Sequence, residues 1–200
     1  MRSVFVQRKV LELYRIFPYI SYPLQPDKLL RYVPLPCKSM TYQHLAEVTG
    51  CSVYDVASIC KSESGATHFD PDSSRYLILY NGEMNIGRIR WTIAHEIGHI
   101  HMGHFQSIEI TENRIAYHDG RASYGACESE ADYFAWNLLA PLPIMREMQI
   151  TSAERTMDTY GLSSQAAEIQ WERYQRWRSH HIKTAWDSEM IRAFRSKATM

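Results

Sequence analysis

Residues 86–104 read IGRIRWTIAHEIGHIHMGH and contain the motif H-E-x-x-H at positions 95–99. His95 and His99 are four residues apart, so on a helix both imidazoles leave the same face. Two neutral imidazoles at this spacing supply adjacent corners of a tetrahedral zinc site. Glu96 lies about 100° further around the helix and can face the open coordination position, where it would serve as a general base. We therefore predict that His95 and His99 bind one zinc ion per chain and that Glu96 is catalytic.

The hydrophobic pattern of the same segment predicts how this helix is oriented. When successive residues are placed 100° apart, four isoleucines lie roughly 120–200° away from His95. They form one apolar stripe opposite the histidines: Ile89, Ile93, Ile97 and Ile100. We expect the helix to bury this stripe and to turn its histidines toward a cleft. The alternative is an ordinary helix with two histidines on its polar face.

Two further histidines and one glycine lie close to the motif. His101 and His104 fall at about 240° and 180° from His95 on the same wheel. This position indicates surface or core-edge histidines rather than additional ligands. Gly98 lies beside the metal face, where a missing side chain leaves room for a close approach.

A second predicted helix, Cys127–Leu139, offers the third ligand that a catalytic zinc needs. Glu128 and Glu130 compete for this place. Glu128 lies on the side with small and apolar residues suited to packing on the first helix, whereas Glu130 lies about 200° away on a polar side. We predict Glu128 as the third metal ligand and keep Glu130 as the alternative.

Asp132 follows Glu128 by four residues and therefore shares its helix face. It can accept a hydrogen bond from the outer N–H of His95 or His99 and so fix the orientation of that ring, as carboxylates beside metal-bound histidines commonly do. The alternative is a solvated helix carboxylate. We predict that Asp132 supports the metal site without binding the metal.

The composition narrows the class of protein. The chain has 200 residues, and its 22 Lys and Arg residues balance its 22 Asp and Glu residues. Such a balance gives no sign of the basic stripe typical of nucleic-acid binding. The chain shows no secretory signal and no apolar run of the ~18 residues that a membrane span needs. Its four cysteines form no C-x-x-C pair. We therefore expect free thiols in a cytoplasmic protein without a membrane partner.

The remaining pattern predicts an α+β fold. A β-hairpin, formed by strands Thr67–Asp70 and Arg75–Tyr80, leads into the long helix Ile86–His104. Residues 105–125 read as polar and irregular. Helices are expected at 3–16, 41–48 and 55–60 on the N-terminal side, and at 143–149, 163–178 and 187–195 on the C-terminal side.

Two segments resemble the ImmA/IrrE metallopeptidase family. Arg88–Ile100 looks like the active-site helix of that family, and Glu128–Pro141 is similar to its second signature, with Ala140 where methionine is common. Gly161–Ala167 is similar to the family segment that follows. The resemblance covers roughly residues 66–177. It implies a compact zincin-like α+β domain in which two histidines and a glutamate bind zinc.

This resemblance completes the predicted architecture. A small antiparallel sheet packs on the H-E-x-x-H helix and on a second ligand helix, with helical N- and C-terminal extensions. We divide the chain into a helical and irregular segment 1–65 of the same domain, a zinc metallopeptidase core 66–178, and a helical tail 179–200.

The resemblance also implies a substrate and a partner. Many family members cleave or inactivate a helix-turn-helix repressor of a phage or mobile element. We therefore expect a zinc-dependent endopeptidase that acts in trans on a cytoplasmic protein, most plausibly such a repressor, without direct contact to nucleic acid. The alternative is a non-cleaving metal-binding module that sequesters a regulator.

Three finer questions stay open at the level of sequence. Tyr76–Tyr80 is a candidate strand for pairing with an extended substrate, against the alternative of a buried strand. Tyr117, His118 and Tyr124 are candidates for stabilising the transition-state oxyanion. A DNA-binding function could use the arginines of the last long helix, but the neighbouring glutamates favour a packing helix with a solvated face.

Overall fold

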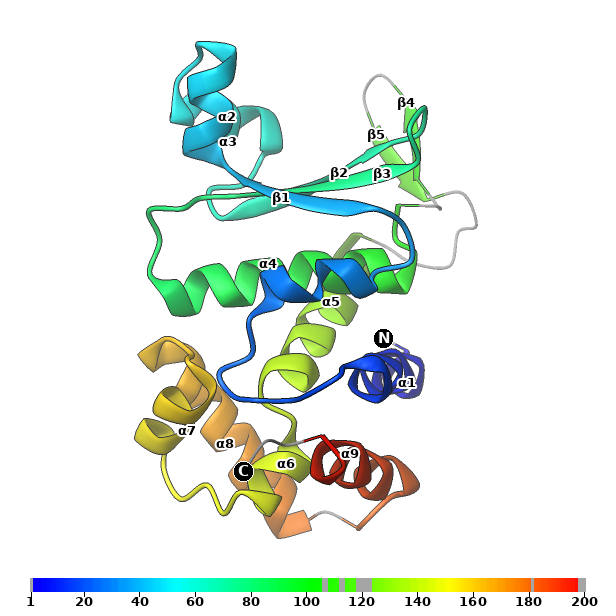
Figure 1. Ribbon diagram of the computed structural model, residues 1–200, viewed down its shortest axis with the longest axis vertical. Helices are drawn as coiled ribbons and strands as arrows, with labels where there is room; N and C mark the ends of the chain where they lie inside the picture. Colours follow the sequence, from blue (N-terminus) through cyan, green and yellow to red (C-terminus); the bar gives the residue numbers. More distant parts are fainter. Residues whose placement is uncertain (1, 106–107, 112–113, 118–123, 181, 198–200) are drawn as a thin grey trace.

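The computed structural model describes residues 2–105, 108–111, 114–117, 124–180 and 182–197 (Figure 1). Its elements in chain order are α1 (Ser3–Ile16), the 3-10 helix η1 (Pro26–Tyr32), β1 (Cys37–Thr41), α2 (Tyr42–Thr49), α3 (Val53–Cys60), β2 (Gly65–Asp70), β3 (Arg75–Tyr80), α4 (Ile86–Met102), β4 (Ile108–Thr111), β5 (Arg114–Tyr117), α5 (Tyr124–Leu139), α6 (Leu142–Glu147), α7 (Ala153–Tyr160), α8 (Ser164–His180) and α9 (Ala185–Arg195). The predicted α+β class is confirmed.

Helix α4 lies at the centre of the molecule. One side of it packs against β2 and β3, and it crosses α5 (Figure 1). Helices α1, α6, α7, α8 and α9 lie on the side of α4 away from the sheet, where α1 packs on both α5 and α9. Ile93, Ile97 and Ile100 are buried in the main hydrophobic core, as the apolar stripe predicts.

Local signals at both ends define α4. The side chain of Asn85 accepts a hydrogen bond of 2.9 Å from the backbone N–H of Arg88 and so caps the first turn. At the other end Gly103 has φ 72°, a left-handed conformation that glycine adopts without steric cost. The helix therefore ends at Met102 rather than at His104, and the chain turns sharply before His104.

The three-stranded sheet has the order β1-β3-β2. The predicted hairpin is present, with Gly65 opposite Tyr80 and Asp70 opposite Arg75. The sheet is mixed rather than purely antiparallel because β1 joins β3 in parallel. Its sequence, CKSMT, lacks the alternation of apolar residues that indicates a strand, so the pattern gave no warning of it.

The position of β3 decides between the two interpretations of Tyr76–Tyr80. Strand β3 is central and pairs with β1 on one edge and β2 on the other. Because both edges are already hydrogen-bonded, the proposal that Tyr76–Tyr80 receives a substrate strand is wrong. The buried-strand interpretation is correct, and β2 is the outer strand of the sheet beside α4.

Helices α4 and α5 approach each other at Gly98. A Cβ atom on Gly98 would lie 3.1 Å from the ring of Phe134 and 3.2 Å from the backbone of Ala131. The small and apolar side of α5, formed by Ala131, Ala135 and Leu138, is fully buried. This contact brings the two predicted ligand helices to the distance at which their side chains can share one ion.

Other parts of the chain differ from the predicted pattern. Residues 108–111 and 114–117 form the β4–β5 hairpin instead of an irregular segment. Helix α7, capped by Ser152, is also absent from the predicted pattern, because its eight residues are mostly polar and include few apolar side chains. The four cysteines are free thiols. No helix in the described part of the chain is long and apolar enough to cross a membrane. The predicted division into three segments stays a prediction.

Candidate metal centre

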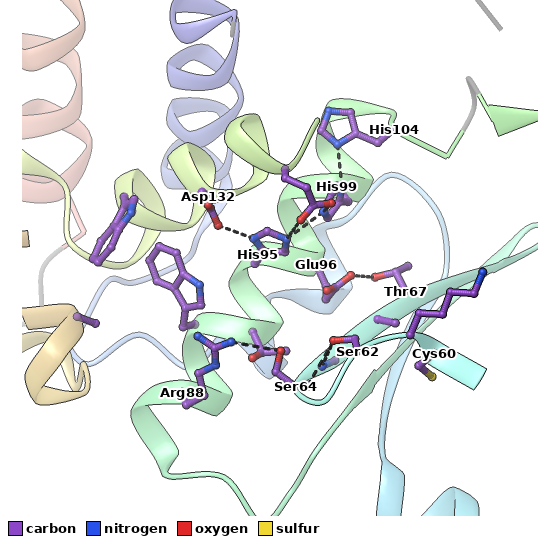
Figure 2. Close-up of a pocket in the computed structure, with 18 of the residues that line it drawn as sticks. Cys60, Ser62, Ser64, Thr67, Arg88, His95, Glu96, His99, His104 and Asp132 are labelled. Atoms are coloured by element: carbon purple, nitrogen blue, oxygen red, sulfur yellow. Dashed lines mark hydrogen bonds and ion pairs between the residues drawn. The ribbon is translucent and has the colours of Figure 1, made fainter. Parts of the chain in front are cut away.

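Helices α4 and α5 bring His95, His99 and Glu128 together. The two Nε2 atoms of the histidines are 3.0 Å apart. The carboxylate oxygens of Glu128 lie 3.3 Å from Nε2 of His95 and 3.4 Å from Nε2 of His99. One ligand atom from each residue therefore lies within 4.8 Å of the others, a spacing that one ion can bridge. Figure 2 shows the two histidines side by side on α4.

Asp132 holds the ring of His95 from the outer side. Its Oδ1 atom lies 2.9 Å from Nδ1 of His95, on the far side of the ring from Nε2 (Figure 2). Because a carboxylate only accepts hydrogen bonds, Nδ1 of His95 carries the hydrogen and Nε2 presents a lone pair. The side chain of Asp132 thus occupies the supporting position that its spacing from Glu128 predicts.

The atoms that converge between the two helices are suited to a cation. Nε2 of His95 and both oxygens of Glu128 face the same point as Nε2 of His99. Burial disfavours the His95 cation, but the hydrogen bonds to Asp132 and Glu128 outweigh it and raise the pKa of His95 to about 9. Burial and the positive charge at His95 lower the pKa of His99 well below its usual value. The cluster therefore favours a positive charge, which a proton on His95 supplies when no metal is bound and which a bound metal ion would supply in its place.

Glu96 lies at the floor of the same cleft, between α4 and β2. It is buried, and the hydroxyl of Thr67 donates a hydrogen bond of 2.8 Å to its Oε2 atom (Figure 2). Burial raises the pKa of Glu96, while the neighbouring His95 and the bond from Thr67 partly oppose this. A carboxylate with a raised pKa is a better proton acceptor near neutral pH than an exposed one.

The cleft around these residues has a volume of about 890 Å³. It is lined by the end of α3, β2 with the loop before it, α4 with residues 104–105 after it, α5, and the start of α8. Trp91 of α4 and Trp136 of α5 both line the cleft, and their rings lie 4.1 Å apart between centroids. The lining side chains from these elements include Ser64, Ala66, Thr67, Arg88, Trp91, Trp136, Gln165, Ala166 and Ile169. The cleft therefore combines a polar floor with one aromatic and apolar wall.

Glu130, the alternative third ligand, is not part of the cluster. Its carboxylate is buried and contacts His104 and Arg2 instead. His104 is not part of the cluster, as expected, but it is buried with its Nδ1 atom 2.8 Å from Nδ1 of His99, so its expected position at the surface or core edge, away from His99, is wrong. The helical wheel did not apply to it because the chain leaves the helix at Gly103. His101 stacks on the ring of Phe134, away from the cluster.

The structure bears differently on the candidates for oxyanion stabilisation and on the DNA-binding alternative. His118 lies outside the described residues, and so do the side chains of Tyr117 and Tyr124; the candidates for oxyanion stabilisation therefore stay predictions. Arg173, the first arginine of the DNA-binding alternative, packs over the ring of Trp136 at 5.0 Å. This contact favours the packing-helix interpretation of α8.

Comparison with known proteins places the chain in a family. Residues 55–172 match the family model of the IrrE N-terminal-like domain, which describes a family of peptidases. A search of curated proteins finds no match. The matched range is more than half of the chain and contains β3 and, among the elements that line the cleft, β2, α4, α5 and the first half of α8. The chain therefore belongs to the ImmA/IrrE family of metallopeptidases.

Proposed function

We propose that the chain is a zinc-dependent endopeptidase in which His95, His99 and Glu128 hold one zinc ion and Glu96 is the general base. The observation that carries this proposal is the convergence of three ligand atoms beside the buried Glu96 in an open cleft. Two imidazoles and one carboxylate with room for a fourth ligand are a common set for catalytic zinc.

The side chains around the cluster divide the chemical work. When bound, zinc acts as a Lewis acid toward the scissile carbonyl and the attacking water. Glu96 accepts the proton of that water and later returns it to the leaving amine. The hydroxyl of Thr67 keeps Glu96 in place, and Asp132 keeps the lone pair of His95 directed at the cluster. Both supporting contacts reduce the reorganisation that the reaction would otherwise require.

Strand β2 supports an extended peptide as the substrate. It is one of the two outer strands of the sheet, and its residues 65–67 line the cleft next to α4. An extended chain that pairs with such a strand gains main-chain hydrogen bonds that do not depend on sequence. Trp91 and Trp136 also line the cleft, where they would contact side chains of the peptide and supply selectivity.

The target that we propose is a helix-turn-helix transcriptional repressor of a phage or mobile element, cleaved in trans in the cytoplasm. The resemblance of α4 and α5 to the ImmA/IrrE signatures supports this choice. The alternative, a non-cleaving module that sequesters the same regulator, would use the metal cluster without needing Glu96.

The experiment compares the wild type with Glu96→Gln. Bound zinc is measured by elemental analysis, and cleavage is measured on co-expressed candidate repressors. We expect about one zinc per chain in both proteins and cleavage only by the wild type. Zinc in both proteins, with stable capture of an uncleaved repressor, would support the sequestering alternative. A wild type that binds no zinc after reconstitution would contradict the proposed metal site.

A further inference from the structure

His104 lies directly behind the ligand His99. The left-handed turn at Gly103 returns the chain toward α4, so that the two rings are 4.9 Å apart between centroids. The two Nδ1 atoms are 2.8 Å apart, a hydrogen-bond distance. Only 5% of the His104 side chain is exposed. His99 therefore receives a buried histidine as its outer partner, whereas His95 receives a carboxylate.

Glu130 contacts the other nitrogen of His104. Its Oε2 atom lies 3.3 Å from Nε2 of His104, and only 3% of the Glu130 side chain is exposed. A buried carboxylate of this kind is strongly destabilising unless it is paired and hydrogen-bonded. A second partner of Glu130 is therefore needed to hold its carboxylate in place beside His104.

That second partner is Arg2, the residue before α1. Its backbone N–H donates to Oε1 of Glu130 at 2.8 Å, and its Nη2 atom donates to Oε2 at 2.7 Å. The Nε atom of Arg2 lies 3.1 Å from Oε1 and 3.2 Å from Oε2. This multiple contact fixes both oxygens of the carboxylate, which is the geometry that favours arginine over lysine.

The hydrogen bonds of these residues run in one consistent direction. The Glu130 carboxylate only accepts, so Nε2 of His104 carries the hydrogen and Nδ1 of His104 presents a lone pair. That lone pair accepts the hydrogen of His99 Nδ1. The Nε2 atom of His99 is then left with a lone pair that faces Nε2 of His95 and Glu128. The arrangement sets the tautomer of His99 that a metal ligand needs.

We infer that Arg2, Glu130 and His104 form a relay that positions His99 as a metal ligand. The inference rests on the proposed function only in requiring a metal at the cluster; it does not require cleavage. Arg2 lies outside the matched family range of residues 55–172. The metal centre of this chain thus depends on a residue that precedes α1 and reaches the site from the far side of α5.

The test measures the zinc dissociation constant of the metal-free protein by competition with a chelator of known affinity. Arg2→Ala is the principal variant because the Arg2 side chain is 55% exposed, so its removal leaves no cavity in the core. Arg8→Ala is the matched control, since Arg8 lies on α1, is 65% exposed and approaches the same Phe5 ring. We expect zinc binding to weaken by about tenfold or more in Arg2→Ala, as for other outer partners of metal ligands. Arg8→Ala should bind like the wild type, and Arg2→Lys should recover part of the loss.

Two further measurements separate positioning from a general loss of stability. In the cobalt-loaded protein, Arg2→Ala should shift the visible absorption bands, which report the ligand geometry, whereas a loss of stability alone would leave them unchanged. In a Glu130→Gln background, Arg2→Ala should cause no additional loss of zinc affinity, because the relay is already interrupted.

The outcomes distinguish this inference from the proposed function. A wild type that binds zinc while Arg2→Ala and Glu130→Gln bind it equally well would overturn the relay and leave the peptidase proposal intact. A wild type that binds no zinc would overturn both. Weakened zinc binding in the variants supports the relay even if no protein substrate is cleaved.

Discussion

The two histidines on α4 that we propose as metal ligands are held in opposite environments. On the cleft side, His95 is oriented by Asp132, whose side chain is 54% exposed. On the core side, His99 is oriented by His104 and Glu130, which are almost completely buried. Both arrangements end in an acceptor-only carboxylate, so both leave a lone pair on Nε2. Each imidazole is thus oriented by an acceptor at Nδ1: His95 by one exposed carboxylate, and His99 by a buried relay.

This difference indicates which part of the metal site is sensitive to substitutions far from the histidines. The cleft side uses α4 and α5 alone, and all of its residues lie within the matched family range. The core side extends through Glu130 to Arg2 and so joins the metal site to the segment before α1. We therefore expect the core side to depend on packing and the cleft side to depend mainly on local geometry.

The largest expected effect concerns Glu96, the proposed general base beside both histidines. Glu96→Gln should lower the cleavage rate by about 10²- to 10⁴-fold because the general base is lost. Zinc stoichiometry should stay at the wild-type value, since Glu96 is not among the three clustered ligand residues. Cleavage kinetics with zinc analysis measure both quantities. An active Glu96→Gln enzyme would show that another group accepts the proton.

Removing the outer partner of each histidine separately tests whether the two sides act independently. Asp132→Asn should weaken zinc binding by about 10- to 100-fold, as loss of an outer partner typically does. Because Asp132 and Arg2 act on different ligands, the effects of Asp132→Asn and Arg2→Ala on the free energy of zinc binding should add. Asp158→Asn, an exposed change on α7, serves as the control. If the double variant binds zinc as tightly as the single variant with the lower zinc affinity, the two sides form one network.

The contact that unites the two sides is the close approach at Gly98. Gly98→Val should destabilise the fold by about 1–3 kcal/mol because the new atoms overlap with α5. The crowded partners are the backbone of Ala131 and the ring of Phe134, and a backbone atom yields less easily than a flexible side chain. Denaturant unfolding measures the loss. Gly125→Ala is the matched control, since a Cβ atom there meets no other atom within 4 Å.

The smallest expected effect lies remote from both sides. Ser52→Ala removes the capping box of α3 and should cost about 1 kcal/mol of stability. Zinc affinity should stay unchanged, because α3 packs on α2 and β2 rather than on the ligand helices. Parallel unfolding and chelator titrations test this. A weakened zinc affinity would mean that metal binding reports overall stability and not local positioning.

The cleft side of the site was accessible from sequence because its information is local. The spacing of His95 and His99, and that of Glu128 and Asp132, follows helical periodicity, which one sequence displays directly. The isoleucine stripe gave the orientation of α4 in the same way. The α+β class followed from the hairpin and the flanking helices.

The core side was missed because its contacts join residues far apart in the chain. Arg2 and Glu130 are separated by 128 positions, and no periodic pattern connects them. His104 was misplaced because one residue in a left-handed conformation ends the helix that the wheel assumed. Strand β1 was missed for a related reason, since its pairing with β3 is decided by the tertiary fold and not by its own weak pattern.

Anomalous diffraction at the zinc absorption edge, on crystals of the zinc-loaded protein, tests the central claim most directly. One strong peak per chain is predicted at about 2.0–2.2 Å from Nε2 of His95, Nε2 of His99 and a carboxylate oxygen of Glu128. A peak at Glu130 in place of Glu128, or no peak between α4 and α5, would contradict the metal site and the function proposed from it.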